Sequence, residues 1–206
     1  MKAAVIGYSG HAFVVIDSIL SGNYQLVGYC ERDEKLYNPF NLAYLGNEND
    51  PEVLNNLKNI DVFLGLGDNL IRAKAFEYLI NKGIRCPYLV HNKANISNFA
   101  TIENGTVIMP GVVINSLAKI GSAVICNSSS VIEHECRIDD YVHIAPGAVL
   151  AGHVSVGKRT FIGANAVIRQ GITIGENAII GAGSVIVRDV EDGEIVYGNP
   201  AKRNNL

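Results

Sequence analysis

The sequence predicts two domains of different architecture, a short parallel α/β sheet followed by a coil of very short strands. Up to about residue 92, brief apolar runs alternate with segments whose apolar residues recur at helical spacing, which is typical of a parallel sheet covered by helices. From Ile96 to Ile186, every sixth residue is Ile, Leu or Val, with Cys126 as the one exception. We therefore expect domains at residues 1–92 and 93–206.

In the first domain, strands are expected to alternate with helices. This order favours parallel pairing, because a strand must return through a crossover to lie parallel to its neighbour. The domain is Rossmann-like but too short for a complete dinucleotide-binding fold. The predicted strands are Lys2–Ile6, Gln25–Cys30, Val62–Leu66 and Arg85–Val90, and the predicted helices are His11–Leu20 and Ile71–Ile80.

In the second domain, a period of six matches neither a helix nor simple strand alternation. It fits flat strands separated by tight turns, with one large and one small side chain of each repeat turned inward. The position four residues after the aliphatic one is mostly small or β-branched, as at Ala118, Val142 and Ala166. Three repeats close a triangular coil, and stacked coils bury a continuous aliphatic column. The repeat predicts about five coils.

Composition excludes several classes of protein. The chain has 206 residues, of which 48% are hydrophobic and 18% charged, with a net charge of -3. This balance argues against disorder and against a basic surface for nucleic acid. No apolar run is long enough to span a bilayer, and the N-terminal apolar stretch is too short for a signal peptide. The cysteines lack metal-binding spacing and lie in apolar settings, so we expect buried free thiols in a cytoplasmic protein.

Three motifs accompany this repeat: GYSGH at Gly7–His11, IEHEC at Ile132–Cys136 and GNPAKR at Gly198–Arg203. The repeat resembles that of the hexapeptide-repeat acyltransferases, and this resemblance implies a left-handed parallel β-helix, a homotrimer and acetyl-CoA bound between neighbouring β-helices. The motifs resemble the sialic acid O-acetyltransferase family of sugar acyltransferases, and especially the enzymes that acetylate a UDP-linked 4-amino sugar in bacillosamine synthesis.

The resemblance implies that His134 is the catalytic base. A histidine is largely neutral at pH 7 yet can accept a proton, so it suits removal of a proton from an attacking amine or hydroxyl. Glu135 is expected to raise the basicity of His134, and Gly152 to supply a backbone N–H for the oxyanion. Adjacent strand residues point to opposite faces, which counts against the pairing with Glu135 and leaves Glu133 as the alternative partner.

The same resemblance implies the remaining binding residues. His143, Ala164 and Ala182 are expected to contact acetyl-CoA. A nucleotide-linked sugar is expected at the loop that follows the first strand, where the N–H groups of a helix start suit a phosphate. The substrate-binding residues expected are Ser9, Gly10, His11, Glu31, Arg32, Gly67, Asn69 and Asn127. The family has an acidic pair where this chain has Glu31 and Arg32, so only its first member is present.

The predicted activity is N-acetylation of the 4-amino group of a nucleotide-linked 4-amino-4,6-dideoxy sugar. Three alternatives stay open. One is O-acetylation of a sialic acid or another sugar, which also uses a histidine base. Another is a non-catalytic β-helix that binds a nucleotide sugar or a partner protein. The third is a zinc enzyme that uses His134, His143 and His153, although their spacing does not fit the zinc β-helix enzymes and we expect no metal.

Overall fold

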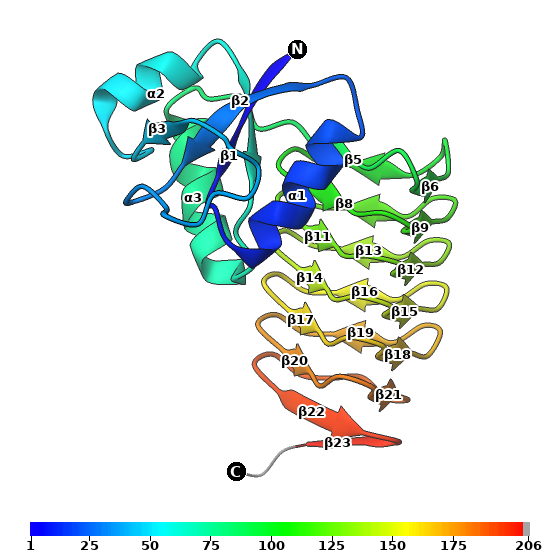
Figure 1. The fold of residues 1–206 in the computed structure, drawn as a ribbon. Coiled ribbons are helices and arrows are strands. Elements are labelled where there is room, and N and C mark those ends of the chain that lie inside the picture. The colour runs from blue at the N-terminus through cyan, green and yellow to red at the C-terminus, as the bar shows by residue number, and fades with distance from the viewer. Residues whose placement is uncertain (204–206) are drawn as a thin grey trace.

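The computed structural model describes residues 1–203, which form an α/β domain seated on one side of a β-helix (Figure 1). The α/β domain has a parallel sheet in the order β3-β2-β1-β4. Parallel strands align their carboxyl ends, so the loops after β1, β2 and β4 meet at one edge of the sheet. The elements are β1 (Lys2–Ile6), α1 (Gly10–Leu20), β2 (Gln25–Cys30), β3 (Tyr44–Gly46), α2 (Pro51–Leu57), β4 (Asp61–Leu64) and α3 (Asn69–Asn81).

This domain confirms the predicted parallel sheet and corrects one strand. The segment Arg85–Val90 does not form a strand of this sheet. Arg85 makes only an isolated bridge to Asp61, and Leu89–Val90 is already the first strand of the β-helix. The sequence analysis also missed β3 and α2. Strand β3 is very short, and α2 begins at a local signal, Pro51 preceded by the capping side chain of Asp50.

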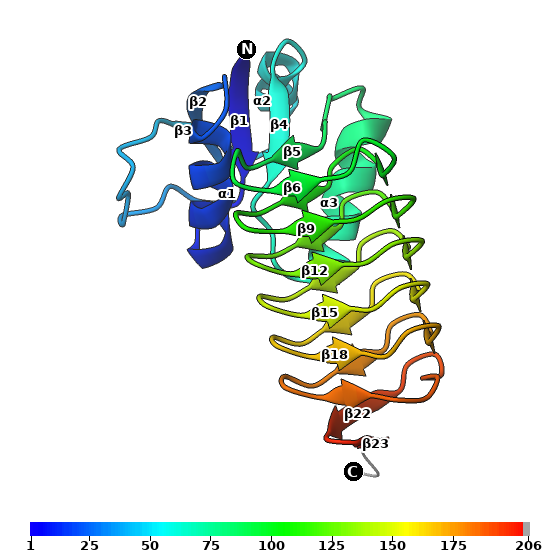
Figure 2. The same cartoon turned by 90° about the vertical axis from the view of Figure 1, so that its right-hand side faces the viewer.

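The β-helix has three flat faces of two-residue strands, stacked in register with a spacing of one coil (Figure 2). The third face has five strands, so about five coils are complete, as predicted. Face one is β5 (Leu89–Val90), β8 (Val107–Ile108), β11 (Ile125–Cys126), β14 (His143–Ile144), β17 (Phe161–Ile162), β20 (Ile179–Ile180), β22 (Ile195–Gly198) and β23 (Ala201–Arg203). Face two is β6 (Asn95–Ile96), β9 (Val113–Ile114), β12 (Val131–Ile132), β15 (Val149–Leu150), β18 (Val167–Ile168) and β21 (Val185–Ile186). Face three is β7 (Thr101–Ile102), β10 (Lys119–Ile120), β13 (Arg137–Ile138), β16 (Ser155–Val156) and β19 (Thr173–Ile174).

The three edges of this prism are the turns that join the faces. We call them edge one–two, edge two–three and edge three–one, after the faces that they connect. The second residue of nearly every strand points inward and is buried, which explains the period of six. Strands β22 and β23 cover the aliphatic column at its C-terminal end, whereas at the other end the α/β domain lies beside face one.

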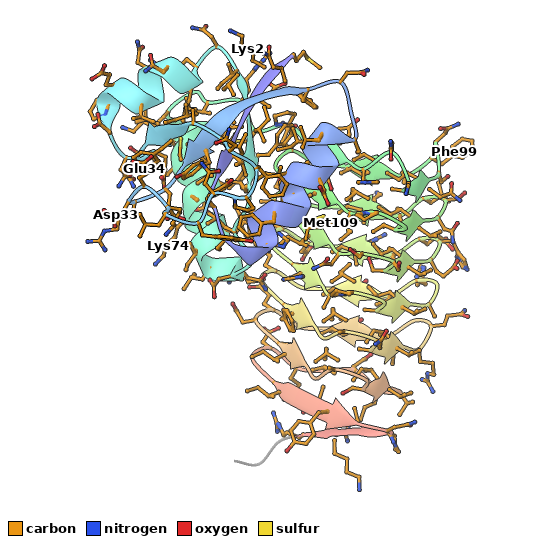
Figure 3. All side chains as sticks on the ribbon, in the orientation of Figure 1. Lys2, Asp33, Glu34, Lys74, Phe99 and Met109 are labelled. Carbon is orange, nitrogen blue, oxygen red and sulfur yellow. The ribbon has the colours of Figure 1, made fainter. Side chains whose placement is uncertain are left out.

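The α/β domain is fixed to face one by a shared core. Val15 and Ile19 of α1 belong to the same buried cluster as Val107 of β8 and Met109, the residue that follows β8. Figure 3 places the Met109 side chain between α1 and the upper coils. This contact holds the carboxyl-end loops of the small sheet at the level of the middle coils. In the part of the chain that is described, no helix has the length and apolar character needed to cross a membrane.

Candidate active site

His134 lies on edge two–three, in the turn that follows β12. The turns of this edge are stacked one coil apart by backbone hydrogen bonds. The N–H of Glu135 donates to the carbonyl of Ser116 at 3.0 Å, and the N–H of His153 donates to the carbonyl of His134 at 2.9 Å. His134 and Glu135 are about half exposed, with side-chain accessibilities of 54% and 50%. The imidazole therefore stands at the surface on a rigid backbone.

His134 and Glu135 form a hydrogen-bonded pair despite being neighbours in sequence. Nδ1 of His134 lies 3.1 Å from Oε2 of Glu135. The reason is the backbone of Glu135, whose φ of 61° is left-handed. Strand alternation ends in this turn, so both side chains project to the same side. A carboxylate at Nδ1 holds a proton there and leaves Nε2 as the basic atom.

Gly152 lies directly under the imidazole of His134. A Cβ atom at this glycine would stand 2.5 Å from both Nε2 and Cε1 of His134. The glycine is therefore needed for steric reasons, because any larger residue would displace the ring. The pair opens on a shallow cleft of about 630 Å³ lined by His134, Glu135, His153, Arg169, Gln170 and Gly171.

A second group of predicted residues gathers around His143 on face one. The Asn127 side chain accepts the N–H of Ser128 at 2.8 Å, so its amide nitrogen faces Nε2 of His143 at 3.1 Å as a donor. Nε2 then carries no proton, and Nδ1 donates to the Gly67 carbonyl at 3.3 Å. Burial, together with the positive charge of Arg72, lowers the pKa of His143 to about 3. The imidazole is neutral at pH 7, and its contact with acetyl-CoA stays a prediction.

His11 lies beside His143 at the start of α1, with ring centroids 6.0 Å apart. Burial also lowers the pKa of His11, to about 4, with a further contribution from Arg72. Its Nε2 is buried and has no hydrogen-bonding partner within residues 1–203. Ser9 and Gly10 are exposed and open α1 at the carboxyl end of β1. This edge presents free N–H groups that suit an anion.

Glu31 follows β2 at the carboxyl edge of the small sheet, and its carboxylate already accepts two backbone N–H groups. Its Oε2 accepts the N–H of Tyr8 at 3.2 Å, and its Oε1 accepts the N–H of Arg32 at 3.1 Å. Lys35 lies 3.6 Å away. Glu31 thus ties the loops after β1 and β2 together, while Arg32 is exposed.

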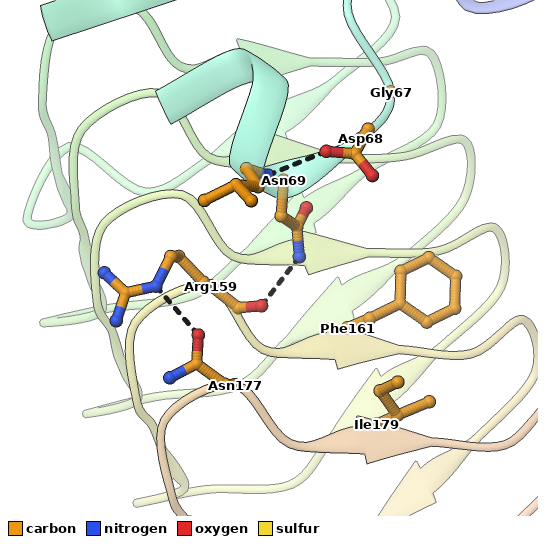
Figure 4. A pocket seen from close by; sticks show the side chains of 8 residues that line it. Gly67, Asp68, Asn69, Arg159, Phe161, Asn177 and Ile179 are labelled. Carbon is orange, nitrogen blue, oxygen red and sulfur yellow. Dashed lines mark hydrogen bonds between the residues drawn. The ribbon is translucent and has the colours of Figure 1, made fainter. Parts of the chain in front are cut away.

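A cleft of about 430 Å³ separates the loop after β4 from face one and edge three–one (Figure 4). The side-chain nitrogen of Asn69 bridges it by donating to the carbonyl of Arg159 at 2.9 Å. Phe161 and Ile179 form its floor, and Asp68 caps α3 above it. The remaining lining residues are Gly67, Leu70 and Asn177.

Ala164 and Ala182 lie one coil apart on edge one–two. The N–H of Gly183 donates to the carbonyl of Ala164 at 2.8 Å. Ala164 is half-buried and Ala182 is exposed, so the edge is lined by small side chains. Asn127 begins a turn of the same edge two coils above Ala164.

The predicted site residues therefore fall into two groups on different edges of one subunit. His134, Glu135 and Gly152 lie on edge two–three. His143, Asn127, Ala164, Ala182 and the loops of the α/β domain lie on face one and edge one–two. One chain brings His134, Glu135 and Gly152 together, and it joins His143 to Asn127 and Gly67. Ala164 and Ala182 lie on lower coils of edge one–two, and the two groups stay apart.

Arg72 is not among the predicted site residues, and its side chain is fully buried in α3. Its Nε donates to the Ala123 carbonyl at 2.8 Å, and its Nη1 to the Gly67 carbonyl at 3.0 Å. Its Nη2 donates to Oδ1 of Asn69 and to the Tyr141 carbonyl, both at 2.8 Å. Burial lowers the pKa of Arg72 to about 9. An arginine within an apolar helical pattern was the only available signal, and no motif marked it.

Within the described residues, no group of three or more His, Cys, Asp or Glu side chains is arranged to hold a metal ion. His143 is bound to Gly67 and Asn127, far from the edge that carries His134 and His153. The geometry of one subunit gives no support to the zinc alternative.

Family models match both domains of the chain. The PglD N-terminal domain matches residues 2–79, and the hexapeptide repeat of succinyl-transferase matches residues 153–188. GDP-perosamine N-acetyltransferase of Escherichia coli is 30% identical over 99 residues, an alignment that covers 48% of this chain and 45% of that protein. The alignment thus spans less than half the length of this curated relative.

Several solved structures match over nearly the whole chain. The acetyltransferase domain of PglB from Neisseria gonorrhoeae is 34% identical, with a TM-score of 0.92 over 98% of this chain and 99% of that chain. It was also solved in complex with acetyl coenzyme A. A histidine variant of perosamine N-acetyltransferase from Caulobacter crescentus, in complex with CoA and GDP-perosamine, is 32% identical. Its TM-score is 0.94 over 100% of this chain and 98% of that chain.

The fold and these matches define a left-handed β-helix protein with an α/β domain at its N-terminus, as the repeat implied. Identity above 30% over nearly the full length of both solved relatives settles the family. The chain belongs to the hexapeptide-repeat sugar acyltransferases that carry a PglD-type N-terminal domain.

Proposed function

We propose that this protein transfers the acetyl group of acetyl-CoA to the 4-amino group of a nucleotide-linked 4-amino-4,6-dideoxy sugar. The observation that carries the proposal is the pair of His134 and Glu135, held over the bare backbone of Gly152. The solved relatives support the substrates, since one was solved with acetyl coenzyme A and the other with CoA and GDP-perosamine. The perosamine relatives are N-acetyltransferases, which favours an amine over a hydroxyl as the acceptor.

In the proposed reaction, Nε2 of His134 removes a proton from the sugar amine as the amine nitrogen attacks the thioester carbonyl. A carbon–nitrogen bond forms and the carbon–sulfur bond breaks. His134 then returns its proton to the departing CoA thiolate. Glu135 stabilises the imidazolium in between, and the Gly152 N–H is available to the oxyanion. The transfer is direct, because the buried cysteines do not offer a thiolate: burial raises the pKa of Cys126 and of Cys136.

The proposal includes a homotrimer whose active sites lie between subunits. It is supported by the two separate groups of site residues, because one subunit would supply edge two–three and its neighbour face one. The outward residues of the three faces also differ. Face three is polar, whereas the lower part of face one carries exposed Phe161, Ile179 and Ile195. On face two the outward residues are Asn95, Val113, Val131, Val149, Val167 and Val185. An aliphatic stripe of this kind is typical of a subunit interface.

The proposal places the enzyme in the cytoplasm, where nucleotide sugars and acetyl-CoA are available. The thiols of Cys30, Cys86, Cys126 and Cys136 are free and buried, which fits a reducing compartment.

A CoA-release assay tests the function. Acetyl-CoA is offered with UDP- and GDP-linked 4-amino-4,6-dideoxy sugars and with free and CMP-linked sialic acid. We expect release with a 4-amino nucleotide sugar and a fall in kcat of at least about 100-fold in His134→Ala. Release of CoA with sialic acid alone would assign O-acetylation instead. If His134→Ala kept its activity, His134 would not be the general base. If no sugar of the panel gave CoA release and the protein did not bind CoA, the non-catalytic alternative would be favoured.

Gly152→Ala is a second, milder test of the same geometry. The new methyl group would meet the imidazole of His134, which can swing outward without disturbing the coil. We expect kcat to fall at least about tenfold while Tm changes little, because the backbone at Gly152 is not left-handed. Gly22→Ala, where a Cβ meets no atom closer than 3.7 Å, is the matched control. Unchanged kcat in Gly152→Ala would mean that the ring position does not matter.

A further inference from the structure

Arg72 is a buried cation without an acidic partner, and folding alone does not explain it. No ion pair of Arg72 occurs among residues 1–203, and Asp68, the nearest contributor of negative charge, is used to cap α3. Removing a charge from water is costly unless it is paired or fully hydrogen-bonded. Arg72 meets this condition only through neutral oxygens of other segments, so its guanidinium fixes those segments to one another.

The guanidinium joins three parts of the molecule. It donates to the loop after β4 at Leu66 and Gly67, over 3.2 and 3.0 Å, and to Asn69 at the start of α3. It also donates to Ala123 and Tyr141, which lie one coil apart on edge three–one. Only arginine carries five donors in a rigid fork, and this geometry uses them on oxygens from several directions.

The Gly67 carbonyl connects this clamp to the proposed site. It accepts from Nη1 of Arg72 and also faces Nδ1 of His143. The proton held at Nδ1 makes Nε2 of His143 an acceptor, and Nε2 in turn orients the amide of Asn127. A displacement of Gly67 would release Nδ1 and allow the imidazole to change tautomer. Arg72 also anchors Asn69, whose amide spans the cleft to Arg159.

We propose that Arg72 is a positioning residue for acetyl transfer, which locks the Leu66–Asn69 loop onto edge three–one and thereby fixes the tautomer and orientation of His143. The proposal rests on the proposed function, in which this loop and His143 contact the nucleotide sugar and acetyl-CoA. Arg72 itself touches neither. It acts through Gly67 and Asn69.

The test compares Arg72→Lys with Arg85→Lys. Arg72→Lys keeps the positive charge but removes the forked set of guanidinium donors. Arg85 is an exposed residue that pairs with Asp61 away from the site, so Arg85→Lys is the matched control. Two readouts are used, the KM for the nucleotide sugar against kcat, and the nitrogen NMR shifts of the His143 ring. In Arg72→Lys we expect a tenfold or greater rise in KM, a kcat within about threefold, and a mixture of tautomers at His143. Arg85→Lys should change neither readout.

Unchanged KM and an unchanged His143 tautomer in Arg72→Lys, with only a lower Tm, would overturn the proposal and leave Arg72 a structural residue. If Arg72→Lys does not fold, Asn69→Ala decides by the tautomer, because it removes one acceptor of the clamp at the surface of the cleft. A single unchanged tautomer there also overturns the proposal. The NMR readout needs no turnover, so a wild-type protein that acetylates no sugar would refute the proposed function without deciding this test.

Discussion

At the scale of single residues, His11 and His143 make the stability of the fold depend on pH. Burial holds the pKa of His11 at about 4 and that of His143 at about 3, both below the ordinary value of 6.5. Between the folded-state pKa of each histidine and pH 6.5, the unfolded chain binds a proton at that histidine that the folded chain does not bind. The contribution is therefore fully present above pH 6.5, and the free energy of unfolding falls as pH decreases, by up to about 1.4 kcal/mol per pH unit for each histidine.

Urea denaturation between pH 7.5 and 4.5 measures this dependence at a fixed protein concentration. We expect the free energy of unfolding of His143→Gln to depend less on pH, by the equivalent of about one proton taken up on unfolding. Glutamine does not titrate, and it retains polar atoms for Gly67 and Asn127. Equal slopes in the wild type and His143→Gln would show that folding does not lower the pKa of His143.

How far single residues could be predicted depends on whether their role is local. His134 is predicted as a site residue from the motif around it, and its expected contact with Glu135 is present in the structure. What strand alternation could not supply is the left-handed turn at Glu135, which is set by the corner of the coil. Arg72 could not be found at all. Its partners at Ala123 and Tyr141 are brought to it only by the docking of two domains.

At the scale of elements, the inward polar residues of the repeat differ in their hydrogen bonding. Oγ1 of Thr160 donates to the Gly175 carbonyl at 2.6 Å and accepts the N–H of Ala178 at 3.0 Å. The hydroxyl of Ser130, at an equivalent inward position, is buried without a partner in the described part of the chain. The first hydroxyl should stabilise the coil, and the second should cost free energy.

We expect Thr160→Val to lower the free energy of unfolding by about 2 kcal/mol, because the Gly175 carbonyl and the Ala178 N–H lose their partner at constant side-chain size. Ser130→Ala should change it by less than about 0.5 kcal/mol, or stabilise the protein. Urea denaturation of the two variants side by side is the measurement. Equal losses would mean that the hydroxyls make no difference and that packing alone determines these positions.

Elements with a strong period were predictable, and elements determined by their neighbours were not. The strands of the β-helix follow from the period of six, since each aliphatic residue must enter the column. The segment Arg85–Val90 has the composition of a strand, and the sequence alone does not say which sheet it joins. Its last two residues, Leu89–Val90, pair with β8 and begin the first coil, a contact between segments one coil apart that local composition does not indicate. Strand β3 is three residues long and too short for any periodic signal.

At the scale of the whole molecule, the α/β domain and His134 face different edges of the prism. Arg72, Asn69 and His143 bind the α/β domain to edge three–one and face one, whereas His134 stands on edge two–three. A nucleotide sugar held by the loops of one subunit would therefore meet His134 of a neighbouring copy. Because of this separation, the proposed trimer would be required for activity and would not merely add stability.

Two inactive variants that damage opposite halves of the site should restore each other. His134→Ala disables edge two–three. Gly10→Asp places a negative charge where the phosphates of the nucleotide sugar would bind, and a Cβ there meets no atom within 4 Å, so the fold is kept. In trimers that assemble at random after co-expression, about a quarter of the shared sites take both intact halves, so about a quarter of wild-type activity should return. A site within one subunit would never contain both intact halves, and the mixture would then stay as inactive as its parents.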